Sequence, residues 1–354
     1  MRRWLRTVHA WAGIVAALLV AVIALSGAAL VFKDDYLQAS LPRFTPAEPD
    51  ESAARLGELA ATAERSFPGQ MRSIVFADTR LRLHRAYLRD GGGAYLDGAG
   101  VIVERWRENG RLEVWLFDLH ERLLLGASGH TTAGCVALAL ITMVMTGVLL
   151  WLPGARAFAW RLWPRSTARR DLLAQHRDFG ILVGTPLLFV ALTGAALVFP
   201  TQAKSFLNLL LSPGSSAAVA PAHISCGVAS ATAPPDWEQI LSRARARFPT
   251  AELRVLSWPG QDGLASVRLK QPGEWHPNGR TRVALCANDR RVVVTEDALA
   301  DTRGGRAYNA VYPLHAAKIG GRPYDVFIAL CGLALAVLAL IGAGSFLRLR
   351  LRRR

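Results

Sequence analysis

Long runs of uncharged or nearly uncharged residues alternate along the chain with polar segments. Four such runs cover residues 8–32, 131–153, 179–200 and 326–347. At about 1.5 Å per residue, each run is long enough to cross the roughly 30 Å of hydrocarbon in a bilayer. The pattern therefore predicts four transmembrane helices.

The two long polar segments, 33–129 and 201–325, have similar patterns. The first has a helix-like stretch, ESAARLGELAATAERSFPG, followed by strand-like SIVFA, HRAYLRD and AYLDGAGVIVERW. The second has helix-like DWEQILSRARARFPT, followed by strand-like ELRVLSW, LASVRLK, TRVALCA and RRVVVTE. Each segment predicts a helix and a small antiparallel sheet. Residues 201–235 are rich in Ser, Ala and Pro, which predicts a connecting loop with little structure of its own.

The apolar runs also repeat in sequence. HAWAGIVAALLVAVIALSGAALVF, beginning at His9, aligns without a gap with HRDFGILVGTPLLFVALTGAALVF, beginning at His176. LFDLHERLLLG and VYPLHAAKIGG precede the second and fourth runs, and in both a glycine follows six and 27 residues after the histidine. Two crossings per repeat return the chain to its starting side, so the halves enter the membrane in the same direction.

Most of the net charge of +15 lies in three short segments beside the apolar runs. Segments 1–7, 153–178 and 348–354 together carry +12. Short arginine-rich segments next to spans stay in the cytoplasm, so the charge indicates orientation and not nucleic-acid binding. We expect both termini in the cytoplasm and the two long polar segments in the periplasm of a bacterial inner membrane. A cleaved leader is disfavoured for the first run because its twin is internal.

The predicted fold is therefore an α-helical membrane protein with four transmembrane helices in two parallel repeats, each with an inserted small periplasmic α+β module. Its expected segments are the first span with its tail (1–32), the first module (33–118), a Leu-His segment with the second span (119–153), a basic cytoplasmic loop (154–175), the third span (176–200), the second module with its insert (201–313), and a Leu-His segment with the fourth span and basic tail (314–354).

Four histidines recur at matched positions of the two halves. His9 and His176 are expected at one depth near the cytoplasmic face, and His120 and His315 at one depth near the outer face. Two imidazoles at equal depth across a twofold axis are placed to bind one iron from opposite sides, as in a bis-histidine b-type haem. Two pairs predict two haems. A histidine at a helix end is alternatively only a polar residue at the interface, but recurrence of all four favours the ligand interpretation.

Gly13 and Gly180 each follow a repeated histidine by four residues, on the same face of the predicted helix. The missing side chain would leave room for a flat ring, although such a glycine also serves helix packing alone.

His130 leaves the outer pair open. Its repeat counterpart is Asp325, so symmetry supplies no partner. Ten residues of continuous helix would carry His120 about 15 Å above His130, which makes His130 an alternative outer ligand. A contact with a haem propionate or a capping role are also open. The remaining histidines, His84, His223 and His276, are expected to be surface or loop residues.

The cysteines separate by segment. Cys226 and Cys286 both fall in the second outward segment, where a disulfide is chemically permitted but spacing does not decide the pairing. Cys135 and Cys331 lie in apolar runs, as small hydrophobic residues do. The sequence has no CxxCH motif, which excludes covalent c-type haem attachment.

Other cofactor classes find no support in the sequence. Glycine-rich nucleotide loops at strand-to-helix junctions and zinc-binding HExxH spacing do not occur. The short cytoplasmic segments are too small to fold around NAD or FAD. Electrons would have to come from a quinol in the lipid membrane or from a separate reductase.

Together the four histidine motifs resemble a known family. VHAWAG…LSGAALVF, LHERLLLG…TGVLLWLP, QHRDFG…LTGAALVFP and LHAAKIGG…FLRLR are similar to the PepSY-associated transmembrane family of bacterial iron-regulated inner-membrane proteins, which includes ferric-siderophore reductases. The resemblance covers essentially the whole chain, and AYLDGAGVIVERW resembles the end of a PepSY domain.

The resemblance implies a haem-containing oxidoreductase that passes electrons outward to iron held by a siderophore or another chelate. His9 and His176 would carry the inner haem, and His120 and His315 the outer one. Reduction to Fe(II) would weaken a hard-oxygen chelate and release the metal. Two alternatives are a membrane-anchored PepSY regulator that binds peptides or proteases, and a small-molecule permease with histidine proton relays.

Overall fold

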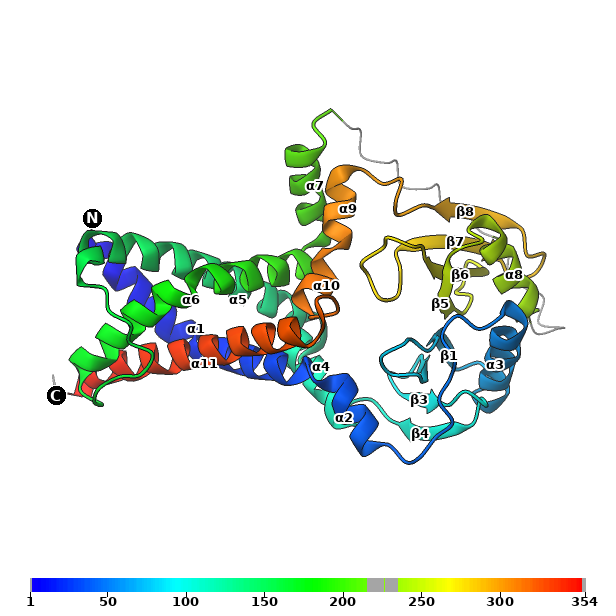
Figure 1. The fold of residues 1–354 in the computed structure, drawn as a ribbon, viewed down its shortest axis with the longest axis horizontal. Helices are drawn as coiled ribbons and strands as arrows, with labels where there is room; N and C mark the ends of the chain where they lie inside the picture. The colour runs from blue at the N-terminus through cyan, green and yellow to red at the C-terminus, as the bar shows by residue number, and fades with distance from the viewer. Residues whose placement is uncertain (1, 215–225, 227–234, 352–354) are drawn as a thin grey trace. The chain divides into compact units, whose positions relative to one another are not determined.

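The computed structural model describes residues 2–214, 226 and 235–351, which form two compact units (Figure 1). We call them the helical unit, residues 1–32, 115–202 and 314–354, and the sheet unit, residues 33–114 and 203–313. Each unit combines residues from both halves of the sequence, so neither half folds as a separate body.

Four described helices of the helical unit are long and apolar enough to cross a membrane, as the sequence predicts. They are α1 (Arg2–Leu30), α5 (Gly126–Trp151), α6 (Arg169–Val198) and α11 (Gly321–Leu351). α1 packs against α11 and α5, and α6 packs against α5 and α11. Buried Val20, Ala24, Leu187 and Leu335 form part of the core between them.

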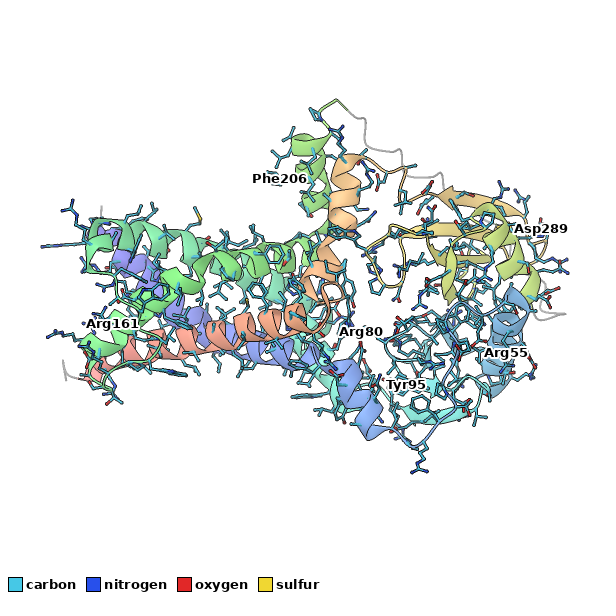
Figure 2. All side chains as sticks on the ribbon, viewed as in Figure 1. Arg55, Arg80, Tyr95, Arg161, Phe206 and Asp289 are labelled. Atoms are coloured by element: carbon cyan, nitrogen blue, oxygen red, sulfur yellow. A yellow bond between two sulfur atoms is a disulfide. The ribbon has the colours of Figure 1, made fainter. Side chains whose placement is uncertain are left out.

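The three arginine-rich segments of the sequence gather at one end of the helical unit. The N-terminus, the connection between α5 and α6, and the C-terminal end of α11 all lie at that end (Figure 1). The connection begins as a 3₁₀ helix, Leu152–Ala157. Arg161, labelled in Figure 2, forms an ion pair with buried Asp178, and Nε2 of Gln175 donates to the carbonyl of Leu162 at 3.0 Å. These contacts fasten the connection to the first turns of α6.

The sheet unit is built on one eight-stranded antiparallel sheet of order β4-β3-β2-β1-β5-β6-β7-β8. The strands are β1 (Met71–Val75), β2 (His84–Leu88), β3 (Gly93–Leu96), β4 (Ile102–Trp106), β5 (Glu252–Ser257), β6 (Leu264–Lys270), β7 (Thr281–Cys286) and β8 (Val292–Glu296). The two expected modules therefore share a sheet, in which Ile74 of β1 lies opposite Leu256 of β5. Each module alone would leave β1 or β5 as an unpaired edge, and their pairing satisfies those backbone groups.

One face of the sheet packs against the two predicted helices. These are α3 (Ala53–Ser66) and α8 (Trp237–Arg247). Side chains at the N-caps define where they start: Ser52 Oγ accepts from the amide of Arg55 at 3.2 Å, and Asp236 Oδ1 accepts from the amide of Gln239 at 3.0 Å. The helices bury Leu56, Leu59, Ile240 and Leu241 against the sheet in a single hydrophobic core.

AYLDGAGVIVERW, expected as a strand, forms the hairpin β3–β4. Asp97 Oδ1 accepts from the amides of Ala99 and Val101, both at 2.9 Å, and Gly100 has a φ of +83° that favours glycine. The DGAG within this stretch is therefore a turn. Gly91 and Gly92 lie in the turn between β2 and β3, where Gly91 has a φ of +86°.

Short helices complete the fold: α2 (Lys33–Ser40), α4 (Leu112–Arg122), α7 (Pro200–Leu211), α9 (Arg303–Asn309) and α10 (Val311–His315). The prediction of a loop from residue 201 was wrong for α7. The breakers Pro213 and Gly214 come only after Leu211, and the residues before them are leucine-rich with no glycine. Phe206 on α7 is 60% exposed (Figure 2).

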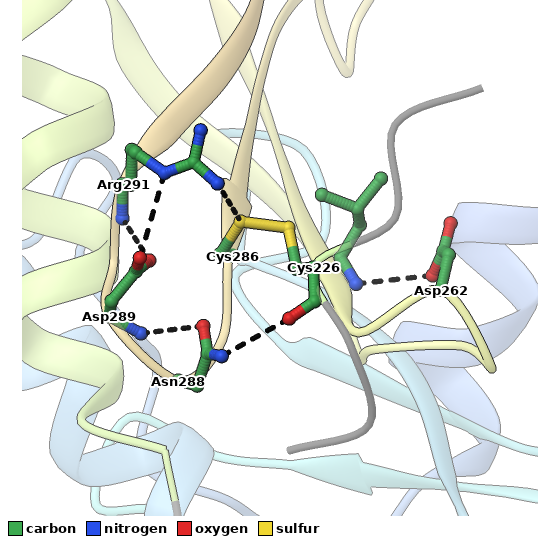
Figure 3. Close-up of a disulfide and its surroundings, with 7 residues drawn as sticks. Cys226, Asp262, Cys286, Asn288, Asp289 and Arg291 are labelled. Carbon is green, nitrogen blue, oxygen red and sulfur yellow. Dashed lines mark hydrogen bonds and ion pairs between the residues drawn. A yellow bond between two sulfur atoms is a disulfide. The ribbon is translucent and has the colours of Figure 1, made fainter.

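Cys226 and Cys286 are joined by a disulfide, with Cα atoms 5.4 Å apart (Figure 3). Cys286 is the last residue of β7. The amide of Cys226 donates to the carbonyl of Asp262 at 2.9 Å, and Nδ2 of Asn288 donates to the carbonyl of Cys226 at 3.2 Å. The disulfide and these bonds fix Cys226 against the sheet at the ends of β6 and β7.

Candidate functional site

The structure brings the four recurrent histidines together as two pairs within the helical unit. His9 of α1 and His176 of α6 have ring centroids 6.5 Å apart and form the inner pair. His120 of α4 and His315 of α10 have ring centroids 6.1 Å apart and form the outer pair. Each pair joins one histidine from each half of the sequence.

Hydrogen bonds define which ring nitrogen is available in the inner pair. Nδ1 of His176 lies 3.2 Å from the carbonyl oxygen of Leu338, which only accepts, so Nδ1 carries the proton. Nδ1 of His9 lies 2.8 Å from Oγ1 of Thr146. That hydroxyl already donates to the carbonyl of Thr142 at 2.8 Å, so it accepts from His9. In both neutral rings the lone pair is therefore on Nε2.

The outer pair has the same arrangement. Nδ1 of His120 lies 2.9 Å from the carbonyl oxygen of Ile23. Nδ1 of His315 lies 3.0 Å from Oγ1 of Thr193, whose proton goes to the carbonyl of Phe189 at 2.9 Å. All four rings thus keep an unprotonated Nε2, which is the form that binds a metal while Nδ1–H fixes the orientation of the ring.

A glycine of a neighbouring helix lies beside each ring of the outer pair. A Cβ added at Gly27 would lie 2.6 Å from Cε1 of His120, and one added at Gly194 would lie 3.2 Å from Cε1 of His315. Any larger residue at these two positions would press on the rings, so glycine is required for the present ring positions.

The inner pair has glycines at the equivalent places. A Cβ added at Gly342 would lie 3.2 Å from Cε1 of His176, and one added at Gly147 would lie 3.6 Å from Cε1 of His9. The approach at Gly147 is an ordinary van der Waals contact, whereas that at Gly342 is tight. A methyl group would therefore displace the adjacent ring most at Gly27, less at Gly194 and Gly342, and least at Gly147.

The arrangement agrees with the distance between two ligands on opposite sides of one metal ion. With metal–nitrogen bonds of about 2 Å and each ring centroid about 1 Å beyond its nitrogen, the two centroids lie roughly 6 Å apart. The observed 6.5 and 6.1 Å match this value. Each pair could present two unprotonated ring nitrogens to one metal ion, as a bis-histidine haem requires.

The sequence also matches a known protein family. The family model described as the PepSY-associated TM region matches residues 6–348. The chain belongs to the PepSY-associated transmembrane family. All four paired histidines lie within the matched residues. No curated protein matches the sequence.

In this PepSY-associated transmembrane protein, His130 lies away from the ring contact of the outer pair. Its Nδ1 is 3.7 Å from Oε1 of Glu121. The contact with the ring of His315 is made by His120. His130 therefore has a neighbouring carboxylate, and His120 makes the ring contact with His315.

The expected continuous helix from residue 120 to residue 130 was wrong. α4 ends at Arg122, and Leu123 and Leu124 have φ values of +52° and +60° before α5 begins at Gly126. Residues with positive φ interrupt a right-handed helix, so the continuous helix from which the 15 Å offset was calculated is absent. A similar break precedes the fourth span, where Ala317, between α10 and α11, has a φ of +51°.

Gly13 and Gly180 contact neighbouring helices. A Cβ at Gly13 would lie 3.1 Å from Cε of Met143, and one at Gly180 would lie 3.8 Å from Cδ2 of Leu338. The glycines that touch the histidine rings are instead the four described above, and two of them belong to the repeated endings LSGAALVF and LTGAALVF. A Ser/Thr-Gly dipeptide recurs at Ser26, Thr146 and Thr193, and this repeat was the available signal for the residues around the rings.

The expectation that His84 lies on the surface was wrong. It is 1% exposed and begins β2, whose alternation places it on the side of buried Ala86. Its Nδ1 accepts from the amide of Ala77 at 3.1 Å. Burial, followed by the charges of Arg55 and Arg254, lowers the pKa of His84 to about 4, so the ring is neutral near pH 7.

A carboxylate does not reverse this effect on His84. Oε1 of Glu51 lies 3.6 Å from Nε2 of His84, beyond hydrogen-bonding distance. Burial also raises the pKa of Glu51, which makes its charge less available.

His276 lies in the loop between β6 and β7, as expected, but is buried there at 6% exposure. Its Nδ1 accepts from the amide of Asn278 at 3.1 Å. Burial, followed by the charges of Arg280 and Arg268, lowers the pKa of His276 to about 2. His223 lies outside the described residues.

Proposed function

We propose that this protein is a bacterial inner-membrane electron-transfer protein that holds two b-type haems and reduces ferric iron, carried by a siderophore, at the periplasmic face. The proposal rests on the two histidine pairs, whose ring centroids lie 6.5 and 6.1 Å apart. In all four rings Nδ1 takes part in a hydrogen bond. The family membership supports it over nearly the whole chain.

The chain's own residues hold and orient the ligands. A haem in each pair would supply a one-electron carrier. The carbonyls of Leu338 and Ile23 and the hydroxyls of Thr146 and Thr193 keep the ring protons on Nδ1. Hydrogen bonds of this kind raise the basicity of the ligand and stabilise the oxidised metal. Two histidines would hold each haem and leave it no open position, so we place the ferric chelate outside the haem sites.

We further propose that the halves are parallel repeats about an axis along the membrane normal. Exchange of α1 with α6 and of α5 with α11 reproduces the observed helix contacts. The three arginine-rich segments share one end of the helical unit, which by the positive-inside rule would face the cytoplasm. Electrons from a quinol or a separate reductase would then enter near the inner pair and leave outward from the outer pair.

A spectrum of the purified protein tests the proposal. The dithionite-reduced minus oxidised spectrum should show b-type bands for two haems per chain. His9→Ala and His176→Ala should each remove the same haem, and the double variant should lose no more than either single one. His130→Ala is the matched control outside the ring contacts and should keep both haems.

A colourless protein made with ample haem would refute the proposal. That result would favour the two readings that need no haem, a membrane-anchored PepSY regulator or a permease. Loss of different haems in His9→Ala and His176→Ala would refute the pairing.

A further inference from the structure

A row of directly opposed residues crosses the middle of the sheet. Arg85 of β2 pairs with Val75 of β1, Val75 pairs with Val255 of β5, and Val255 pairs with Arg268 of β6. Opposed residues of antiparallel strands project from the same face. The next residues along β2 and β6 belong to the core beneath α3 and α8, so the row faces the other side of the sheet.

A third arginine joins this row from the irregularity in β5. Arg254 is 1% exposed, and its Nε donates to the carbonyl of Pro277 at 3.2 Å. Its Nη2 lies 3.5 Å from Oδ2 of Asp78, and the same oxygen lies 3.7 Å from Nη2 of Arg85. One carboxylate is therefore shared between two guanidinium groups.

The segment before β7 adds a fourth arginine and the ring of His276, and α10 adds the ring of Tyr312. The ring of His276 lies 4.9 Å from that of Tyr312 in α10. Arg280 is close enough to act on the charge of Arg268, whose pKa is lowered to about 10 by burial first and by Arg280 second. We call these residues the arginine cluster: Arg85, Arg254, Arg268, Arg280, His276 and Tyr312.

Carboxylates around the cluster reduce its positive charge but leave guanidinium nitrogens without hydrogen bonds. Asp78 is shared between Arg85 and Arg254, which Asp34 and Glu252 also influence. Glu274 acts on the charges of Arg268 and Arg280, while its oxygens accept from amides of its own loop. His276 stays neutral and contributes no charge. Among the described residues, Nε of Arg85 and Nε of Arg280 are buried without a hydrogen-bond partner. Buried guanidinium nitrogens without hydrogen-bond partners cost free energy, which an anion bound there would offset.

We propose that the arginine cluster binds an anionic, carboxylate-bearing ferric chelate. This inference rests on the proposed function for the identity of the metal, and on the sheet unit alone for the charge and donor groups of the ligand. Arg85 and Arg268 stand three strand spacings apart, roughly 14 Å, so a ligand with several acidic groups contacts both better than a single small anion does. Guanidinium groups bind carboxylates through two parallel hydrogen bonds, which suits this choice of ligand.

Binding of redox-inert gallium complexes to the full-length protein tests the site. Isothermal titration should show gallium citrate, a polyanion, binding at least about tenfold more tightly than a neutral gallium trihydroxamate or inorganic phosphate, as expected for one or more charged hydrogen bonds. Arg268→Gln should weaken gallium citrate binding by about tenfold or more and leave the neutral complex unaffected. Arg268→Lys should restore part of the affinity.

Arg282→Gln is the matched control. Arg282 lies opposite Arg268 on β7 and is paired with Glu296 at 2.7 Å, so its charge is already compensated. It should change the affinity less than about twofold. Equal loss in Arg282→Gln and Arg268→Gln would overturn the proposal. So would equal binding of the three ligands by the unaltered protein, a result that needs no variant to fold.

The outcomes separate this site from the proposed function. Gallium cannot be reduced here, so tight, Arg268-dependent binding of gallium citrate to a protein that transfers no electrons would keep the site and refute the reductase. Reduction of ferric chelates with no dependence on their charge or on Arg268 would keep the reductase and overturn the site.

Discussion

Adding one methyl group beside the outer pair is the most direct test of the site geometry. In Gly27→Ala the new Cβ would lie 2.6 Å from Cε1 of His120, whereas carbon atoms in contact normally stand about 3.5–4.0 Å apart. The ring must move by about 1 Å to relieve the overlap. It is held by the hydrogen bond from Nδ1 to the carbonyl of Ile23 at 2.9 Å, which a shift of that size would break.

The cost can be estimated from similar overpacking. Extra methyl groups in a packed interior typically cost about 1–3 kcal/mol. Because each 1.4 kcal/mol is about tenfold in affinity, haem should bind the outer pair roughly 5- to 150-fold more weakly in Gly27→Ala. Alanine improves the helix itself by about 1 kcal/mol relative to glycine, which offsets part of the overpacking cost to folding.

Gly147→Ala is the matched control, since its Cβ would lie at an ordinary 3.6 Å from Cε1 of His9. Gly194→Ala and Gly342→Ala, both at 3.2 Å, should fall between the two. Haem content per chain and a potentiometric titration of the purified proteins measure the effect. Two haems with unchanged midpoint potentials in Gly27→Ala, or equal damage in Gly147→Ala, would refute the reasoning.

Three further predictions concern single contacts. Thr193→Val removes the hydroxyl that accepts a hydrogen bond from His315, and it should raise the midpoint potential of one haem. Thr142→Val loses only a hydrogen bond within its own helix and should leave both potentials unchanged. Equal shifts in the two variants would contradict this prediction. Reduction of the Cys226–Cys286 disulfide, which closes a separation of 60 residues, should destabilise the sheet unit by about 4 kcal/mol in thermal unfolding without altering haem spectra. The pKa of His84 is about 4 in the folded protein and 6.5 in the unfolded chain, so the unfolded chain takes up the proton first as the pH falls. The free energy of unfolding should be full above pH 6.5 and should fall towards pH 4 by on the order of 3 kcal/mol. His84→Gln should reduce this loss in denaturant titrations.

Local patterns in the sequence were sufficient to predict the four spans and to choose which histidines pair. Runs of about 20 apolar residues have a clear meaning in a bilayer, and a repeat with two crossings per half places equivalent residues at equal depth. His9 with His176, and His120 with His315, are the pairs that the structure brings together. The helices α3 and α8 were also expected, since their apolar residues recur with helical spacing.

Features that depend on a few backbone dihedral angles were not predicted from the sequence. The positive φ of Leu123 and Leu124 ends α4 and moves His120 away from the line of α5, and leucine gives no sign of such a conformation. His84 reads as a polar residue at a strand end, although strand alternation gave a usable signal for its burial.

The sequence by itself determined that this is a membrane protein with four spans, which histidines are equivalent, and which segments are basic. Only the tertiary structure decided that the two modules share one sheet, that Ser/Thr-Gly dipeptides lie beside three of the four rings, and that Arg85 and Arg268 lie in one row. The physical reason is the range of the interactions. Hydrophobic periodicity and charge are properties of a single segment and can be recognised from its sequence. The pairing of β1 with β5 and the histidine ring contacts join residues more than a hundred positions apart. At such separations many pairings are possible, and tertiary packing selects one of them.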